Sequence, residues 1–425
     1  MSITANSELS ESAVVASLIR SSTIRRVAVL YAGVAIVCLT VAASLPLLSA
    51  AAAWSQVQDY MQIFGFAATL VLGAWFCWLA QRSSDVLAAA RLSFLLWTAG
   101  IALRLGADLY LGRWQILLAA SALLQAAAFV VVVASAIQCR AWRVFASEDG
   151  KLHLWALILM GGGCSMAGAL AANVYQSVRL APAAYGPVFP RMFETGLLIV
   201  SVWGFMAPMA WAVSAAVLPE LLVLKSTRSR LLIAACVLDA AGIAGVLAGK
   251  LHFASVLLLH AAIFAPSSLR VFGKSQRPVT DINHPGFIRL AYVWLRIAAT
   301  LGVWASVHNA APIWAASRHL LVVGFVCTLA LALFEWAVGR LAGMRLELHG
   351  RMMFTALLLL NVGCPLQAVA EILGGQGYVP RMAHVLPLAA AVELVAVLLF
   401  GANMLAGMLN ANAEVAEGVE AAEEI

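Results

Sequence analysis

The sequence predicts an all-α polytopic membrane protein with about twelve transmembrane helices. Of the 425 residues, 63% are hydrophobic and only 11% are charged, whereas soluble domains carry about 25% charged residues. A bilayer core about 30 Å thick is crossed by roughly 20 apolar residues in a helix. The chain contains continuous apolar runs of this length, without the alternation of a membrane β-barrel. These runs lie near 27–52, 61–80, 92–111, 116–137, 153–173, 195–218, 231–249, 252–269, 287–306, 319–339, 353–373 and 384–408.

The apolar runs divide the chain into three parts. Residues 1–26 form a polar N-terminal segment, 27–408 a twelve-helix transmembrane domain, and 409–425 an acidic tail. The first run is too long for a signal-peptide core, so we expect it to remain as a helix. From Glu414 onward the tail holds glutamates and no Lys or Arg, which predicts a solvated, disordered end.

Basic residues predict the orientation. With both termini in the cytoplasm, eighteen Lys and Arg residues fall on the cytoplasmic side and six on the other side. Such a bias is the usual topology signal of membrane proteins. It also accounts for the sequence pI near 9.1, because loop arginines and lysines suit anionic lipid headgroups. The basic charge therefore indicates a bilayer as partner and gives no indication of nucleic acid.

The dipeptide Gly-Phe occurs in three apolar runs, at Gly65-Phe66, Gly204-Phe205 and Gly324-Phe325. Each is followed by a polar or basic loop and then by a helix with another glycine, 35, 38 or 39 residues after the first. The units begin 139 and 120 residues apart, which corresponds to four helices each. This spacing predicts three four-helix repeats around a pseudo-threefold axis.

The seven cysteines are dispersed, and no two form a CxxC pair. This pattern argues against a disulfide framework or a zinc ribbon. We therefore predict that the cysteines, including Cys364, serve as small apolar packing residues.

Five groups of residues over about 285–405 form a recognisable pattern: Tyr292-Val293-Trp294-Leu295, Arg318-His319, Gly324-Phe325, Gly343-Met344-Arg345 and Leu359-Leu360-Asn361-Val362-Gly363. This pattern resembles the C-terminal half of the NnrS family, in a divergent branch. Members are twelve-helix bacterial membrane proteins, described as containing haem and copper and linked to relief of nitric oxide stress. The resemblance implies a multi-pass protein of the bacterial cytoplasmic (inner) membrane that binds haem b.

The sequence departs from the family in its first half. Founding members carry two histidines just before the first Gly-Phe, where this chain has Gln58 and Tyr60. Neutral imidazole is a good ligand for haem iron or copper, and a glutamine amide is a poor one. The histidine of the second half remains as His319. The resemblance therefore implies the fold more firmly than it implies the metal chemistry, whether haem or copper.

Candidate site residues follow from this resemblance. A haem b needs one or two histidines within the apolar layer, and His319 with His260 is the predicted pair, for haem or another metal. Arg104 and Arg296 lie within predicted spans and would neutralise the propionates. The structural alternatives are histidines bonded to water or carbonyl groups at the interface and charge pairs that fix helix register. The charges within spans are Arg104, Asp239, Arg296, Glu335 and Glu393, and their pairing is left open.

Three function classes follow. The first is a haem- or metal-binding protein of redox chemistry or the nitric oxide response. The second is a cofactor-free small-molecule transporter or channel on the same scaffold, which Gln58 and Tyr60 favour. The third is a scaffold for other membrane subunits. Phosphate-binding loops, hydrolase triads and zincin motifs are missing from the sequence, so no enzyme class is assigned.

Overall fold

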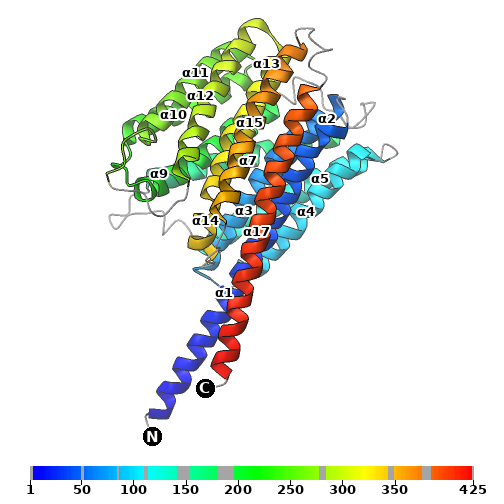
Figure 1. The fold of residues 1–425 in the computed structure, drawn as a ribbon. Coiled ribbons are helices and arrows are strands. Elements are labelled where there is room, and N and C mark those ends of the chain that lie inside the picture. The colour runs from blue at the N-terminus through cyan, green and yellow to red at the C-terminus, as the bar shows by residue number, and fades with distance from the viewer. Residues whose placement is uncertain are drawn as a thin grey trace.

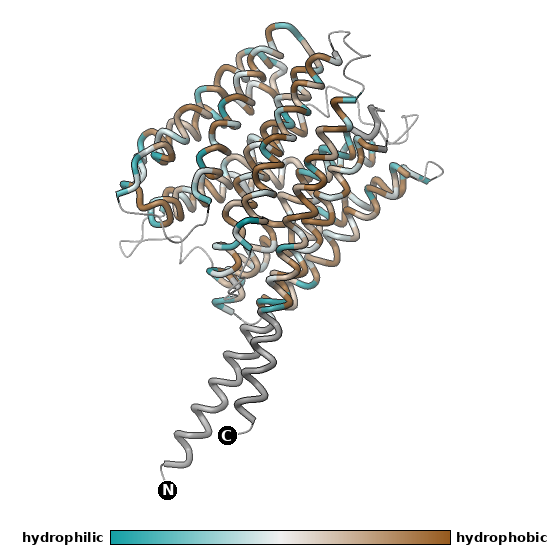
Figure 2. Tube along the Cα trace, in the orientation of Figure 1, coloured by the Kyte–Doolittle hydropathy of each residue, from teal (hydrophilic) through white to brown (hydrophobic). Residues whose placement is uncertain are grey.

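The computed structural model describes residues 3–48, 52–83, 86–109, 113–140, 153–179, 196–276, 284–342, 349–375 and 384–423. Within these ranges the chain is helical and contains no strand, and twelve helices are long and apolar enough to cross a membrane. Apolar residues cover the length of these helices, and hydrophilic residues gather near their ends (Figure 2). The prediction of an all-α polytopic membrane protein is confirmed.

The twelve spans are arranged as three units of four. The first unit comprises α1 (Ile3–Leu48), α2 (Ala52–Tyr60), η1 (Met61–Ala68), α3 (Thr69–Ala80), α4 (Val86–Leu109) and α5 (Trp114–Gln138), in which α2, η1 and α3 form one span. The second comprises α7 (Leu154–Arg179), η3 (Val200–Met206), α9 (Ala207–Leu221), α10 (Ser229–Leu247) and α11 (Leu251–Ser268). The third comprises α12 (Pro285–His308), α13 (Ala311–His319), η4 (Leu320–Cys327), α14 (Thr328–Ala342), α15 (Gly350–Gly375) and α17 (Val385–Glu423).

The units close into a ring. The last helix of each unit packs on the first helix of the next, as α5 on α7, α11 on α12 and α17 on α1. An even number of spans places both ends of the chain on one side of the bundle, and Figure 1 shows the two termini together there. The terminal helices are longer than predicted: α1 begins at Ile3, and α17 continues to Glu423. Residues 409–423 of the predicted tail continue α17, and their many Ala and Glu residues are strong helix formers.

The second span of each unit lies at the centre. These three spans are the most buried of the twelve among the described residues, and each contains a π-helical segment, η1, η3 or η4. The three π-helical segments contact one another. Each one contains a Gly-Phe pair, so the predicted pseudo-threefold repeat is confirmed and its axis runs among these segments. Such π-helical turns are rare and are frequently found at functional sites.

The glycine of each Gly-Phe pair lets the central span approach the first helix of its own unit. A Cβ atom on Gly65 would lie 2.7 Å from Cys38 Cβ, and one on Gly324 would lie 2.9 Å from Trp294 Cβ. In the second unit, a Cβ on Gly204 would lie 3.0 Å from that of Ser165. Only glycine fits such contacts, and small residues are the usual means of close helix packing in membranes.

The second glycine of each unit brings the third and fourth helices together. Opposite Gly100, Gly242 and Gly363, the nearest side chains are Gln125, Leu258 and Glu393, respectively. Five residues before each Gly-Phe, the central span presents Tyr60, Ile199 or His319. The repeat therefore defines one equivalent position in each unit, occupied by Tyr60 with Gln125, Ile199 with Leu258, and His319 with Glu393.

In the first unit this position holds a neutral hydrogen bond. The Tyr60 hydroxyl donates to Gln125 Oε1, and both residues are buried. Replacing Tyr60 with phenylalanine removes the donor and leaves the amide oxygen buried. We expect Tyr60→Phe to lower the free energy of unfolding by about 1 kcal/mol, measured by denaturant titration of the purified protein in detergent micelles. An unchanged free energy of unfolding would contradict a stabilising role for this hydrogen bond.

Candidate metal centre

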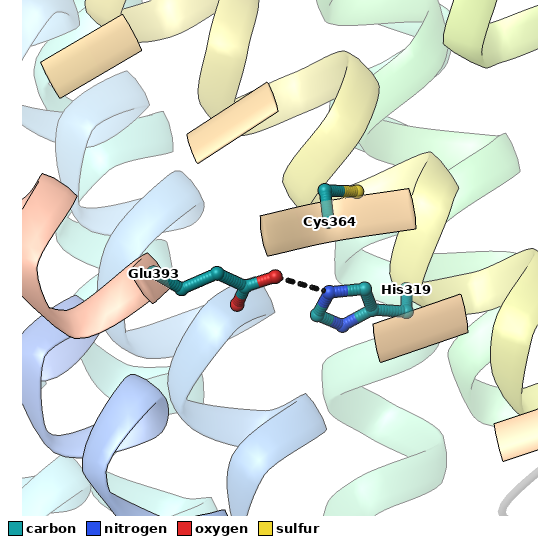
Figure 3. A group of neighbouring side chains, drawn as sticks. All are labelled: His319, Cys364 and Glu393. Carbon is teal, nitrogen blue, oxygen red and sulfur yellow. Dashed lines mark hydrogen bonds and ion pairs between the residues drawn. The ribbon is translucent and has the colours of Figure 1, made fainter. Parts of the chain in front are cut away.

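Three side chains with metal-ligating atoms meet in the third unit. His319 ends α13, Cys364 lies in the middle of α15, and Glu393 lies in α17. Their ligand atoms all lie within 4.8 Å of one another, and His319 Nε2 is 2.8 Å from Glu393 Oε1. Figure 3 shows the three side chains converging from three helices.

The repeat explains why these residues meet. His319 is the central-span residue of the equivalent position and Glu393 is its partner on the fourth helix. Cys364 directly follows Gly363, the glycine that allows α15 to approach α17. The same packing therefore forms the hydrogen bond of the first unit and the ionisable cluster of the third.

The cluster is removed from solvent. His319, Cys364 and Glu393 are 4%, 0% and 2% exposed. A buried carboxylate is costly unless it is paired and hydrogen-bonded, and Glu393 has this partner in His319. Such a pair within the apolar layer is more typical of function than of stability, since charged pairs in low dielectric seldom repay their desolvation.

A second polar network holds the neighbouring turns in place. Trp294 Nε1 donates to Asn361 Oδ1 at 2.7 Å, and Asn361 Nδ2 donates to Thr328 Oγ1 at 3.3 Å. The Thr328 hydroxyl in turn donates to the carbonyl of Val323, five residues earlier, in η4. These bonds join α12, α15 and the central span one turn from Gly363, and so fix the helices that carry the cluster.

The three donors suit a single transition-metal ion. Imidazole, thiolate and carboxylate are the ligands that Zn²⁺ and its neighbours take in proteins. Binding would remove the proton from the Cys364 thiol and would insert the ion between His319 and Glu393. Three protein ligands leave a fourth position open, which is the arrangement of reactive rather than structural sites.

The structure places the two predicted histidines differently. His319 is buried in the cluster, and its recorded partners are Glu393 and Cys364. His260 is exposed on α11, where its Nδ1 lies 2.7 Å from the carbonyl oxygen of Val256 on the preceding turn. The predicted pairing of His260 with His319 is therefore replaced by the pairing of His319 with Glu393. The physical reason is the rotation of α11: Leu258, the residue at the equivalent position of the second unit, lies on the buried face of this helix, and His260 lies on the exposed face.

The predicted arginines lie outside the cluster. Arg104 is buried in α4, with its Nε 3.4 Å from Asp108 Oδ2 and its guanidinium 5.4 Å from the centre of the Tyr60 ring. Arg296 is half-buried on α12, 4.6 Å from the centre of the Phe272 ring. Arg104 therefore has its contacts within the first unit, and Arg296 contacts a residue that follows α11 of the second unit.

The other charges predicted within spans also find different surroundings. Glu393 pairs with His319 and not with an arginine. Asp239 is 3% exposed on α10, and its Oδ1 has no hydrogen-bond partner in the described part of the chain. Glu335 is half-buried on α14. The charges within the spans are thus distributed over all three units.

Cys364 is the residue of the cluster that the sequence did not single out. The cysteines are dispersed along the sequence, which favoured a packing role for Cys364. Glu393 was recognised only as a charge within a predicted span. The signal that could have found both was the repeat itself, because Cys364 follows the second glycine of the only unit with a histidine five residues before Gly-Phe.

The described parts of the chain define a class: a membrane protein with twelve candidate spans in three four-helix units and a buried His-Cys-Glu cluster. No protein-family model matches this sequence, and no curated protein matches it either.

Proposed function

We propose that this chain is an NnrS-like integral membrane protein that binds a single transition-metal ion at His319, Cys364 and Glu393. The observation that carries the proposal is the convergence of three different ligand types within 4.8 Å in a buried site. The resemblance of the third unit to the NnrS family supports a role in the nitric oxide response or in redox chemistry. The arginine distribution supports a location in the bacterial cytoplasmic membrane with both termini inside.

A single ion accounts for the geometry better than haem b does. A haem would need a flat slot beside His319, with its iron bound through the nitrogen that now faces Glu393. The neighbouring helices are in close contact instead: a Cβ on Gly363 would lie 2.6 Å from Glu393 Cγ. The first unit, where the founding family members have histidines, holds the Tyr60–Gln125 hydrogen bond.

The proposed chemistry is that of a buried metal with one open position. The protein supplies three ligands from three helices, so the geometry of the ion is fixed by helix packing. The surrounding apolar layer excludes water, and small uncharged molecules such as nitric oxide dissolve in that layer. A metal with an open coordination position could bind such a molecule, whereas bulk anions are kept out.

Metal analysis of the purified protein tests the proposal. We expect about one transition-metal ion per chain in the wild type, and a loss of most of it in Cys364→Ser, because a hydroxyl is a far weaker ligand than a thiolate. Cys77→Ser, which changes a buried cysteine in the first unit, should keep the metal. Optical spectra of the same samples, reduced minus oxidised, distinguish an ion from haem by the Soret band. A metal-free, colourless wild type after growth with ample haem, copper, iron and zinc would refute the proposal in favour of a cofactor-free carrier.

A further inference from the structure

Polar side chains follow one face of α15 from the His-Cys-Glu cluster to the end of the helix. Cys364, Gln367 and Glu371 are spaced i, i+3 and i+7, which places them on a common face. Gln367 Nε2 donates to Glu371 Oε1 at 3.2 Å. The stripe ends near Gly375, at the end of the bundle opposite the chain termini, where α13 also begins.

A charged pair joins two central spans beside this stripe. Arg318 Nε lies 3.3 Å from Asp59 Oδ2, and the side chains are 20% and 14% exposed. Each residue stands six positions before the Gly-Phe of its unit, so the pair links equivalent positions across the pseudo-threefold axis. Glu371 lies seven residues beyond Cys364 on α15 and accepts the hydrogen bond from Gln367, so it stands at the end of the stripe away from the buried cluster.

The stripe contains polar atoms that lack partners. Among the described residues, Gln367 Oε1 and Glu371 Oε2 have no hydrogen-bond partner, although Gln367 is only 2% exposed. Unpaired buried acceptors are costly, and cations satisfy such oxygens. Asp59, Arg318 and Glu371 are half-buried, whereas Gln367 and Cys364 are 2% and 0% exposed, so the stripe runs from partly exposed residues to fully buried ones.

We propose that this stripe is the entry path by which a transition-metal cation reaches the His-Cys-Glu cluster, with Glu371 as the carboxylate that the ion passes and the Asp59–Arg318 pair as the charged entrance. The proposal rests on the metal site proposed above. Two carboxylates and one guanidinium give the entrance a net negative charge, which attracts cations and raises their rate of arrival. Arg318 opposes this attraction and lies directly before the ligand His319. The arginine distribution would place the entrance on the non-cytoplasmic side.

The rate of Co²⁺ loading tests the entry path. Co²⁺ bound to a thiolate has visible absorption, so uptake by metal-free protein in lipid nanodiscs can be followed by stopped-flow mixing. We expect Glu371→Gln and Asp59→Asn to load about tenfold more slowly and Arg318→Gln about tenfold faster, because each changes one charge at the entrance. Glu220→Gln, an exposed carboxylate at the other end of the bundle, should load at the wild-type rate.

The final amount of bound Co²⁺ separates the two proposals. All four variants should reach the wild-type amount, because their changes lie outside the three ligands. Added salt should slow the wild type more than Glu371→Gln, since screening acts on the charge that the variant has lost. Wild-type loading rates in Glu371→Gln and Asp59→Asn would overturn the entry path and leave the metal site standing. A wild type that binds no Co²⁺ would overturn both.

Discussion

Replacing Glu393 with glutamine is expected to lower the affinity for Zn²⁺ by at least about 100-fold. Changes to the groups that merely support metal ligands cost about 10–100-fold, and Glu393 is a proposed ligand itself. The glutamine keeps the size of the side chain and a hydrogen-bonding oxygen for His319 Nε2. Competition with a coloured chelator measures the affinity in detergent solution.

The matched control for Glu393→Gln is Asp239→Asn. Asp239 is also a carboxylate buried in the apolar layer, 3% exposed, but it lies on α10 in the second unit. It undergoes the same change of charge and should keep the wild-type affinity for Zn²⁺. Equal affinities for Glu393→Gln and the wild type would rule out Glu393 as a ligand. A similar loss in both variants would indicate a general effect of buried charge.

Replacing Gly363 with alanine is expected to weaken both the fold and the metal site. The new Cβ would lie 2.6 Å from Glu393 Cγ and 3.2 Å from the backbone oxygen of Ala389 and from the backbone nitrogen of Glu393. Both Glu393 and the α17 backbone must therefore move. Overpacking of this kind costs about 1–3 kcal/mol, and displacement of Glu393 should lower the Zn²⁺ affinity by about 10–100-fold. Thermal unfolding and the chelator competition measure the two effects.

Gly161→Ala serves as the control for Gly363→Ala. A Cβ on Gly161, in α7, would meet no atom within 4 Å. Alanine is also the better helix former by about 1 kcal/mol, so this variant should be as stable as the wild type or slightly more so. If Gly363→Ala behaves in the same way, the close contact between α15 and α17 does not position Glu393.

The spacing of the three Gly-Phe pairs was the sequence feature that predicted the arrangement of the helices. It predicted three units of four helices, and the structure shows that each Gly-Phe pair lies in a π-helical segment at the centre. The helical segments were predictable because a membrane requires long apolar runs. The π-helical turns were not, since the sequence of η4 is uniformly apolar and has no feature that distinguishes it from an α-helix.

The sequence singled out His319 as a candidate ligand and Glu393 as a charge within a span, but it did not show that the two meet. His319 stood out through its motif, and Glu393 through its charge in an apolar run. Cys364 did not stand out, because a cysteine in an apolar run is an ordinary packing residue. His260 was a candidate because it lies within a predicted span. The position of a residue along a span does not show the direction in which its side chain faces.

The sequence by itself determined the class of protein, the number of spans and the threefold repeat, because these depend on composition and on distances along the chain. Only the tertiary structure decided that His319 meets Cys364 and Glu393. The three residues are 45 and 29 positions apart along the chain, and they meet because Gly363 brings α15 against α17 while His319, at the end of α13, faces both. The rotation of each helix about its axis is set by side-chain packing between helices, which no single apolar run specifies.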